Sequence, residues 1–474
     1  MDWFLNLLTA PWRFLKRVAR GFMVMSLASR IAWATAAFLT FFVLLTLCAL
    51  LLASGTGWTT LQAWWSPGKG LFVGALVIVV SVLVYYAARL WLQRENSRFP
   101  DIDAAWNAAL GEMERQQIDL RNSPLFLVLG CDGQEQERAI IGEAPVQFLV
   151  TASPAGSAPL HAHAGHDGVF VCLSSIGQSC LLADMLRSIL ATSRSTAALS
   201  TAPLLPLTAG AGLGGLSSSQ RDEATDRLTA ICEHIRASRS PLAPVNGILS
   251  LVPFSPEDDA LATCKTMGQA ICEDVMTVTK AFGLRVPLTV AFTDLDKMEG
   301  FPELIKHLPA VDRLKAVGQS FPPSLSATAD QLATVSAVTC GRLAELVAGK
   351  LGNAGSANQL LVNRKFIALM ARIRLTMIAR INAVLDNALN FSAPGAGSPM
   401  LAGCYVMATD AMADRRAFVR GMFDRMLAVQ AELDWTPAKV SADVWSRRMA
   451  GILKIVNVAL VLGIIGIILW RSMK

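Results

Sequence analysis

Charged residues are scarce in this 474-residue chain: Asp, Glu, Lys and Arg make up 16%, whereas hydrophobic residues make up 53%. An average soluble domain carries about 25% charged residues, so this composition argues against a wholly soluble protein. The deficit is concentrated in three apolar runs, each long enough to cross a hydrocarbon core about 30 Å thick. The runs are 31–53, 70–92 and 452–470, and they carry no charge, one Arg and one Lys, respectively. The sequence therefore predicts three transmembrane helices.

Positive charge is nearly absent between the first two runs, where Lys69 is the one basic residue. Five basic residues precede the first run, and arginines surround the end of the second. The positive-inside rule therefore places the N-terminus and the long middle region in the cytoplasm, and the C-terminus outside. Residues 1–30 alternate aromatic and basic residues, which indicates either an amphipathic helix on the inner leaflet or a helical start of the first span. These juxtamembrane charges account for most of the net +6, so nucleic-acid binding is not predicted.

The sequence also lacks a CxxC pair: its nine cysteines are scattered singly. This excludes a disulfide or zinc framework of recognisable spacing, and we expect reduced, apolar core cysteines. His161, His163 and His166 lie in a stretch rich in Ala, Gly and Pro, residues 153–168. Because no carboxylate or thiol accompanies them at matching spacing, a solvated loop is favoured over a metal site.

Apolar runs alternate with helical periodicity through the middle of the chain, which indicates an α/β fold with a doubly wound parallel sheet, like that of P-loop NTPases. From about residue 310 to 390 the periodicity is almost entirely helical. The expected strands are 125–129, 146–151, 168–173, 246–253, 286–293 and 400–408, and the main helices are 222–238, 257–282 and 417–433. The expected organisation is a cytoplasmic N-terminus (1–30), a transmembrane hairpin (31–92), a connecting helix (93–122), a nucleotide-fold domain (123–309), a helical subdomain with a returning strand (310–450) and a third transmembrane helix (451–474).

A working phosphate loop is missing from the place where one is expected. Gly130 and Gly133 follow the buried run 125–129, as in a strand–loop–helix unit that cradles phosphates. Such a loop continues with Gly, Lys and Ser or Thr, because the Lys contacts the β- and γ-phosphates and the hydroxyl contacts the metal ion. Here those positions are Glu135, Gln136 and Glu137, so two carboxylates would repel a polyphosphate.

Five short segments are similar to motifs of one family and occur in the same order between matching apolar runs. Pro244-Val-Asn-Gly-Ile-Leu resembles the strand "PlNGvi", and Gly300-Phe-Pro-Glu-Leu resembles "GFxeff". The remaining three segments are 284–290, 317–322 and 401–406. Together they resemble the IcmF/TssM family, inner-membrane proteins of type VI and type IVB secretion systems.

The resemblance implies a nucleotide site that is degenerate in this chain. The family's GxxGxGKT loop has Gln136 and Glu137 at its Lys and Thr positions, its Asp-Thr-Ala-Gly segment retains only Gly177, and its Thr-Lys-x-Asp segment lacks the Lys. With the phosphate cation and the metal-side Asp absent, we expect that hydrolysis is lost, with no catalytic residue, metal or cofactor. Asp296 is either a base-reading remnant or a helix N-cap. The remnant positions are Gly130, Asp132, Gly133, Gly177, Thr293, Asp294 and Asp296.

The resemblance further implies a structural, multi-pass component of a secretion complex in a bacterial inner membrane. Its partners would be a TssL/DotU-like membrane protein, baseplate or other cytoplasmic components, the lipid bilayer and further copies of itself. Gly463 and Gly466 are small enough to allow close contact between spans, but at a spacing of three residues they are equally consistent with ordinary positions of an apolar helix. The family's large periplasmic domain is expected to come from a separate protein or to be dispensable. The alternatives are a membrane-tethered NTPase with a non-standard phosphate loop, and a membrane-anchored regulator outside any secretion system.

Overall fold

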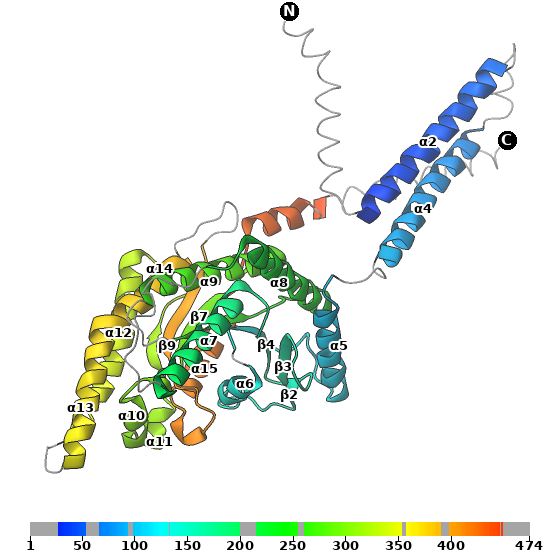
Figure 1. Cartoon of the computed structure of the whole chain (residues 1–474). Coiled ribbons are helices and arrows are strands. Elements are labelled where there is room, and N and C mark those ends of the chain that lie inside the picture. Colours follow the sequence, from blue (N-terminus) through cyan, green and yellow to red (C-terminus); the bar gives the residue numbers. More distant parts are fainter. Residues whose placement is uncertain are drawn as a thin grey trace, which may run out of the picture. The chain divides into compact units, whose positions relative to one another are not determined.

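The computed structural model forms two compact units, Met1–Arg98 and Phe99–Lys474 (Figure 1). The residues that it describes are 27–53, 66–92, 98–131, 133–199, 215–254, 260–352, 357–389, 398–445 and 447–448. The predicted third span, nearly all of the N-terminal amphipathic segment and Asp132 lie outside the described residues.

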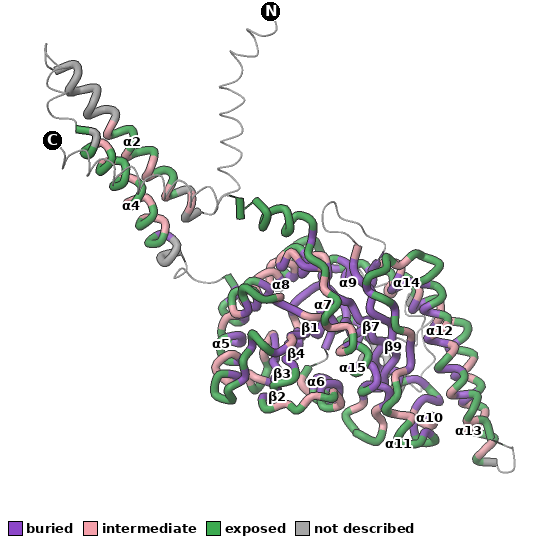
Figure 2. Tube along the Cα trace, turned by 180° about the vertical axis from the view of Figure 1, so that it is seen from behind, coloured by how far each residue is buried: buried purple, intermediate pink, exposed green. Residues whose placement is uncertain are grey.

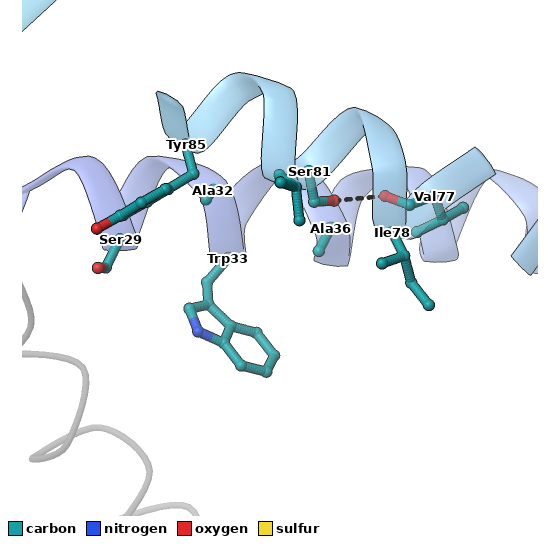
Figure 3. Close-up of a pocket in the computed structure, with 9 residues that line it drawn as sticks. Ser29, Ala32, Trp33, Ala36, Val77, Ile78, Ser81 and Tyr85 are labelled. Atoms are coloured by element: carbon teal, nitrogen blue, oxygen red, sulfur yellow. Dashed lines mark hydrogen bonds between the residues drawn. The ribbon is translucent and has the colours of Figure 1, made fainter. Parts of the chain in front are cut away.

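The first unit is a helical hairpin of α2 (Leu27–Ala53) and α4 (Pro67–Leu92), which pack side by side in antiparallel directions (Figure 3). Small side chains, Ala32, Ala36 and Ser81, line a groove of about 400 Å³ between them. Trp33, Phe38, Phe72 and Leu83 are each 60–68% exposed, which suits contact with lipid. Among the described residues one helix, Gly68–Ala88, is long and apolar enough to cross a membrane, and Ile31–Val43 is a shorter apolar helix. Three spans are therefore not confirmed.

The second unit is built on an eight-stranded sheet in the order β2-β3-β4-β1-β5-β7-β9-β8 (Figure 1). The central strands β4, β1, β5, β7 and β9 are parallel, whereas β2, β3 and β8 are antiparallel additions at the two edges. The strands are β1 (Leu125–Leu129), β2 (Val150–Ser153), β3 (Leu160–Gly165), β4 (Gly168–Leu173), β5 (Gly247–Pro253), β7 (Pro287–Thr293), β8 (Val317–Ser320) and β9 (Met400–Val406), with a separate pair β6 (Leu284–Arg285) and β10 (Asp434–Trp435). The predicted α/β class is confirmed, with a sheet that is mixed and not wholly parallel.

Every residue of the five parallel strands is buried, because helices cover both faces of the sheet (Figure 2). Leu125, Leu127 and Leu129 belong to a core shared with α7, α8, α9 and α14, whereas Phe126 and Val128 belong to a core shared with α6 and α15. The helices are α5 (Pro100–Arg115), α6 (Gly133–Ile141), α7 (Gln178–Leu199), α8 (Ser218–Arg239), α9 (Ala260–Phe282), η1 (Leu295–Lys297), α10 (Phe301–His307), α11 (Ala310–Arg313), α12 (Ala329–Ala348), α13 (Ala357–Arg372), the π-helix η2 (Ile373–Met377), α14 (Ile378–Leu389), η3 (Ala413–Arg415) and α15 (Val419–Ala428).

Two expectations from the sequence are wrong. Residues 153–168 are not a solvated loop, because β3 crosses them and pairs along its whole length with β4. Its alternating His and Ala residues have the two-residue period of a strand, and His161 and His163 are buried on one face while His166 is exposed in the turn. The region 310–390 also contains a strand, β8, which pairs with β9 at the edge of the main sheet. The finer division into six segments remains a prediction.

Candidate functional site

The loop after β1 occupies the position in the sheet where α/β proteins bind ligands. From β1 the chain continues to the strands on one side, β2 to β4, and then crosses to β5 on the other side. Ligands of open α/β sheets bind at the carboxyl ends of the strands beside such a switch point. Gly130 begins the loop with φ +84°, and α6 starts at Gly133 with φ +65°. The predicted strand–loop–helix unit is therefore present.

Gly130 is packed against β5 so closely that no side chain fits. A Cβ at Gly130 would lie 2.4 Å from the carbonyl oxygen of Leu251, whereas a Cβ at Gly133 would meet nothing within 4 Å. We therefore expect Gly130→Ala to destabilise the domain by about 2–4 kcal/mol, from overpacking and the left-handed backbone. Gly133→Ala should cost only about 1 kcal/mol, for the backbone alone. Thermal unfolding of the detergent-purified variants checks this, and equal melting temperatures would contradict it.

The side chain of Arg187, from α7, lies against the phosphate-loop frame. Its Nη2 donates hydrogen bonds to the Gly130 carbonyl, at 2.8 Å, and to Gln136 Oε1, at 3.2 Å. Its Nε lies 3.6 Å from Asp294 Oδ2, at the end of β7. Gln136, at the position of the phosphate-binding Lys, in turn donates to the hydroxyl of Thr409 at 3.3 Å. One buried guanidinium therefore connects the loop after β1 with the loop after β7.

Glu137, at the position of the metal-binding hydroxyl, is fully buried in an ion pair with His161. His161 Nδ1 lies 3.1 Å from Oε1 and 2.9 Å from Oε2, and Ser174 donates to Oε1 at 2.8 Å. Burial by itself would raise the pKa of Glu137, but the hydrogen bond from His161 and the nearby ring of His163 lower it below its usual value. Burial would likewise lower the pKa of His161, but the Glu137 carboxylate raises it. Both shifts favour the charged forms of the pair.

This geometry corrects the expectation that two carboxylates face the phosphate position. Glu135 is exposed on the outer side of α6, and the charge of Glu137 is already balanced by His161. The loop side chains are thus paired with one another and are not unpaired acids.

The end of β4 and the start of α7 are held by an acid from another helix. Gly177 has φ +101° and lies beside Asp274 of α9. The Asp274 carboxylate accepts hydrogen bonds from the backbone N–H of Gln178 and Ser179, both at 2.8 Å, and from the Ser179 hydroxyl at 2.6 Å. Burial raises its pKa to about 6. A helix N-terminus is a ready anion site, and here the protein fills it with its own carboxylate.

The end of β7 carries the last group of predicted residues. Asp294 has φ +65°, accepts a hydrogen bond from the hydroxyl of the buried Thr293 and pairs with Lys297 at 2.7 Å. Asp296 lies within η1 and is not its N-cap, which corrects that alternative. Its Oδ1 accepts the backbone N–H of Thr409 at 3.0 Å, and burial raises its pKa. Asp296 therefore ties the chain after β7 to the chain after β9.

The structure thus brings the predicted loops together through residues that the sequence did not indicate. Arg187 joins Gly130 to Asp294, and Thr409 joins Gln136 to Asp296. Gly133 is exposed and takes no part in this network. Only the period of the His/Ala alternation could have indicated that His161 is buried near the loop, and no local signal marks Arg187, Asp274 or Thr409.

All five segments that resemble family motifs lie within one region that matches a known family model. Residues 221–451 match the family model of the IcmF-related N-terminal domain. These residues therefore belong to the IcmF-related family. The matched region runs from α8 past β10, so it includes Asp274, Asp294, Asp296 and Thr409. No curated protein and no solved structure matches the chain.

Proposed function

We propose that this protein is a structural inner-membrane component of a type VI-like secretion apparatus, whose degenerate nucleotide-fold domain binds partner proteins. The IcmF-related domain indicates a secretion-system component, and the exposed apolar hairpin supports membrane attachment. The proposed orientation has the main domain in the cytoplasm and the C-terminus in the periplasm, from the distribution of basic residues.

The proposal that the domain is not an enzyme depends on the network of contacts around Arg187. A phosphate loop offers positive charge and free N–H groups to a phosphate, and a transferred phosphoryl group is stabilised electrostatically. Here the guanidinium of Arg187 is bonded to the Gly130 carbonyl and to Gln136, and the carboxylate of Glu137 is paired with His161. A nucleotide would have to break buried charged contacts, and breaking one such pair costs about 3–5 kcal/mol. Hydrolysis is therefore proposed to be lost.

Nucleotide titration tests this proposal directly. We expect calorimetric titration of the full chain in detergent with Mg·GTP or Mg·ATP to give no saturable heat. Gly133→Arg, which places a long side chain at an open position of the loop, should leave this result unchanged. Magnesium-dependent binding to the native chain that disappears in Gly133→Arg would overturn the proposal and favour a tethered NTPase.

An exposed apolar stripe on α13 and η2 supports the partner-binding part. Leu360, Leu361, Ile367 and Leu375 are 55%, 60%, 57% and 79% exposed, respectively. Their spacing places most of them on one side of a continuous helix, and Arg364 and Arg374 are exposed beside them. Such a stripe suits an amphipathic partner helix with acidic flanks. Within the proposed function, its occupant is the TssL/DotU-like membrane protein; baseplate components and further copies of the chain bind elsewhere.

Charge substitution on the stripe tests that assignment. In co-expression with the TssL/DotU-like partner, Ile367→Asp and Leu375→Asp should each reduce co-purification by at least about tenfold, because each buries a charge in an apolar contact. Leu325→Asp is the matched control, since Leu325 is 53% exposed and lies outside the stripe. Equal recovery of the partner with all three variants would contradict the proposal that this stripe binds the partner. It would not affect the separate prediction that the chain does not bind nucleotide.

A further inference from the structure

A second cluster of chemically active side chains lies between α6 and the sheet, behind the Glu137–His161 pair. Glu137 of α6, His163 of β3 and Cys172 of β4 each offer a ligand atom, and these atoms lie within 4.8 Å of one another. Each of the three residues is at most 2% exposed. His161 pairs with Cys172 across the β3–β4 ladder, and His163 pairs with Phe170, so all four side chains share the face that α6 covers.

His163 Nε2 has no hydrogen-bond partner among the described residues. The nearest charged atom is Glu137 Oε2, at 4.0 Å, and the other ring nitrogen accepts a long hydrogen bond of 3.3 Å from the backbone N–H of Ala152. Leaving a buried polar atom unsatisfied costs about 1–3 kcal/mol. A buried, unpartnered imidazole nitrogen aimed at a carboxylate and a thiol therefore points to an absent ligand.

We propose that Glu137, His163 and Cys172 bind a divalent transition-metal ion, for which Zn²⁺ is the best fit. A donor set of one carboxylate, one imidazole and one thiolate suits zinc, whereas the thiolate disfavours Mg²⁺ and Ca²⁺. Cys131, which is buried in the same core cluster as Cys172, can supply the fourth ligand of a closed tetrahedral site. Tetrahedral zinc donors lie about 3.5 Å apart, so the side chains would move together by about 1 Å.

The surrounding charges fit a bound cation. His161 Nδ1 lies beside the Glu137 carboxylate, and its Nε2 lies 2.9 Å from the Gly156 carbonyl and 3.1 Å from Gln134 Nε2. One carboxylate and two thiolates carry three negative charges, and Zn²⁺ would neutralise two of them. His161 would then orient the ligating carboxylate, as partners of metal ligands commonly do. If His163 bound the ion through Nε2, its proton would lie on Nδ1. Nδ1 could then no longer accept the long hydrogen bond from the Ala152 N–H.

The site would be a structural metal site that links several elements of the domain. Its ligands come from the loop after β1, from α6, from β3 and from β4, so one ion would fix the degenerate loop to the edge of the sheet. With four protein ligands it has no open position for a water or a substrate. The proposal is independent of the partner-binding function, because it concerns stability and metal content alone.

Metal content of the full chain tests the proposal. After exposure to excess Zn²⁺ and removal of free ion, the native chain in detergent should retain about one equivalent by mass spectrometry. Substitution with Co²⁺ should give the absorption band of a thiolate-to-cobalt charge transfer. Cys172→Ala and His163→Phe should each weaken metal affinity by at least about 100-fold. Cys232→Ala, at an equally buried thiol of α8, is the matched control and should bind normally.

The proposal would be overturned by any of the following results: no stoichiometric metal in the native chain, cobalt bound without the charge-transfer band, or unchanged affinity in Cys172→Ala. Loss of the band in Cys232→Ala as well would place the metal elsewhere and have the same consequence. If Cys172→Ala fails to fold, the native-chain metal content and cobalt spectrum still decide, because the band requires a thiolate ligand.

Discussion

Replacing Glu137 with Gln is expected to lower the free energy of unfolding of the α/β domain by about 3–5 kcal/mol. The carboxylate of Glu137 is fully buried and paired with His161, which is itself 2% exposed. The neutral amide of the substituted Gln would leave a protonated His161 without its counter-charge. If His161 instead released its proton, one ring nitrogen could no longer donate a hydrogen bond to its acceptor oxygen. Either outcome carries the desolvation cost of a buried charged or polar group.

Hydrogen–deuterium exchange of peptides from β1, β3 and β4 measures this loss in the detergent-purified chain, with a chelator present so that metal content is constant. Glu135→Gln is the matched control on the same helix, because Glu135 is exposed, and it should change stability by less than about 0.5 kcal/mol. The double variant Glu137→Leu/His161→Phe should recover part of the loss, since it removes both charges. Similar exchange rates in Glu137→Gln and Glu135→Gln would show that the pair is not charged in the folded protein.

The second large effect is a dependence of stability on pH that comes from Asp274. Its folded-state pKa of about 6 lies above the ordinary value of 3.8, because burial disfavours the carboxylate. Between these values the folded protein holds a proton that the unfolded chain has released. The contribution of Asp274 to stability is therefore fully present below about pH 4 and is lost as the pH rises through 6. The difference corresponds to about 3 kcal/mol.

Asp274→Asn should remove this dependence. We expect the stability of the native chain relative to Asp274→Asn to fall by about 2 kcal/mol between pH 4 and pH 7, measured by exchange of peptides from α7 and α9. Because other carboxylates titrate in both proteins, the difference isolates Asp274. Glu273→Gln, at the exposed neighbouring position, is the control: its difference in stability from the native chain should stay nearly constant between pH 4 and pH 7. A stability difference for Asp274→Asn that stays constant or grows with pH would contradict a raised pKa.

Strands that are buried on both faces could be predicted from the sequence because their composition alone reveals them. β1 and β4 were predicted with the bounds that the structure shows, and β5, β7 and β9 are predominantly apolar runs. β3 was missed because its histidines, counted as polar, suggested a solvated loop. Burial of His161 depends on a counter-charge, and that counter-charge is supplied by Glu137, which lies 24 residues earlier in the chain.

The amino-acid sequence by itself determined the apolar hairpin, the α/β class, the resemblance to the family and the presence of Gln136 and Glu137, instead of a Lys and a hydroxyl, after β1. Each of these depends on residue type at short range, where composition and period are sufficient. Tertiary structure alone decided which distant side chains contact the loop after β1 and the start of α7. Arg187 reaches the loop of Gly130 from 57 residues away, and Asp274 caps a helix that begins 96 residues earlier. Such contacts arise from the order of strands in the sheet, which brings the carboxyl ends of β1, β4 and β7 to one edge, and no local pattern encodes them.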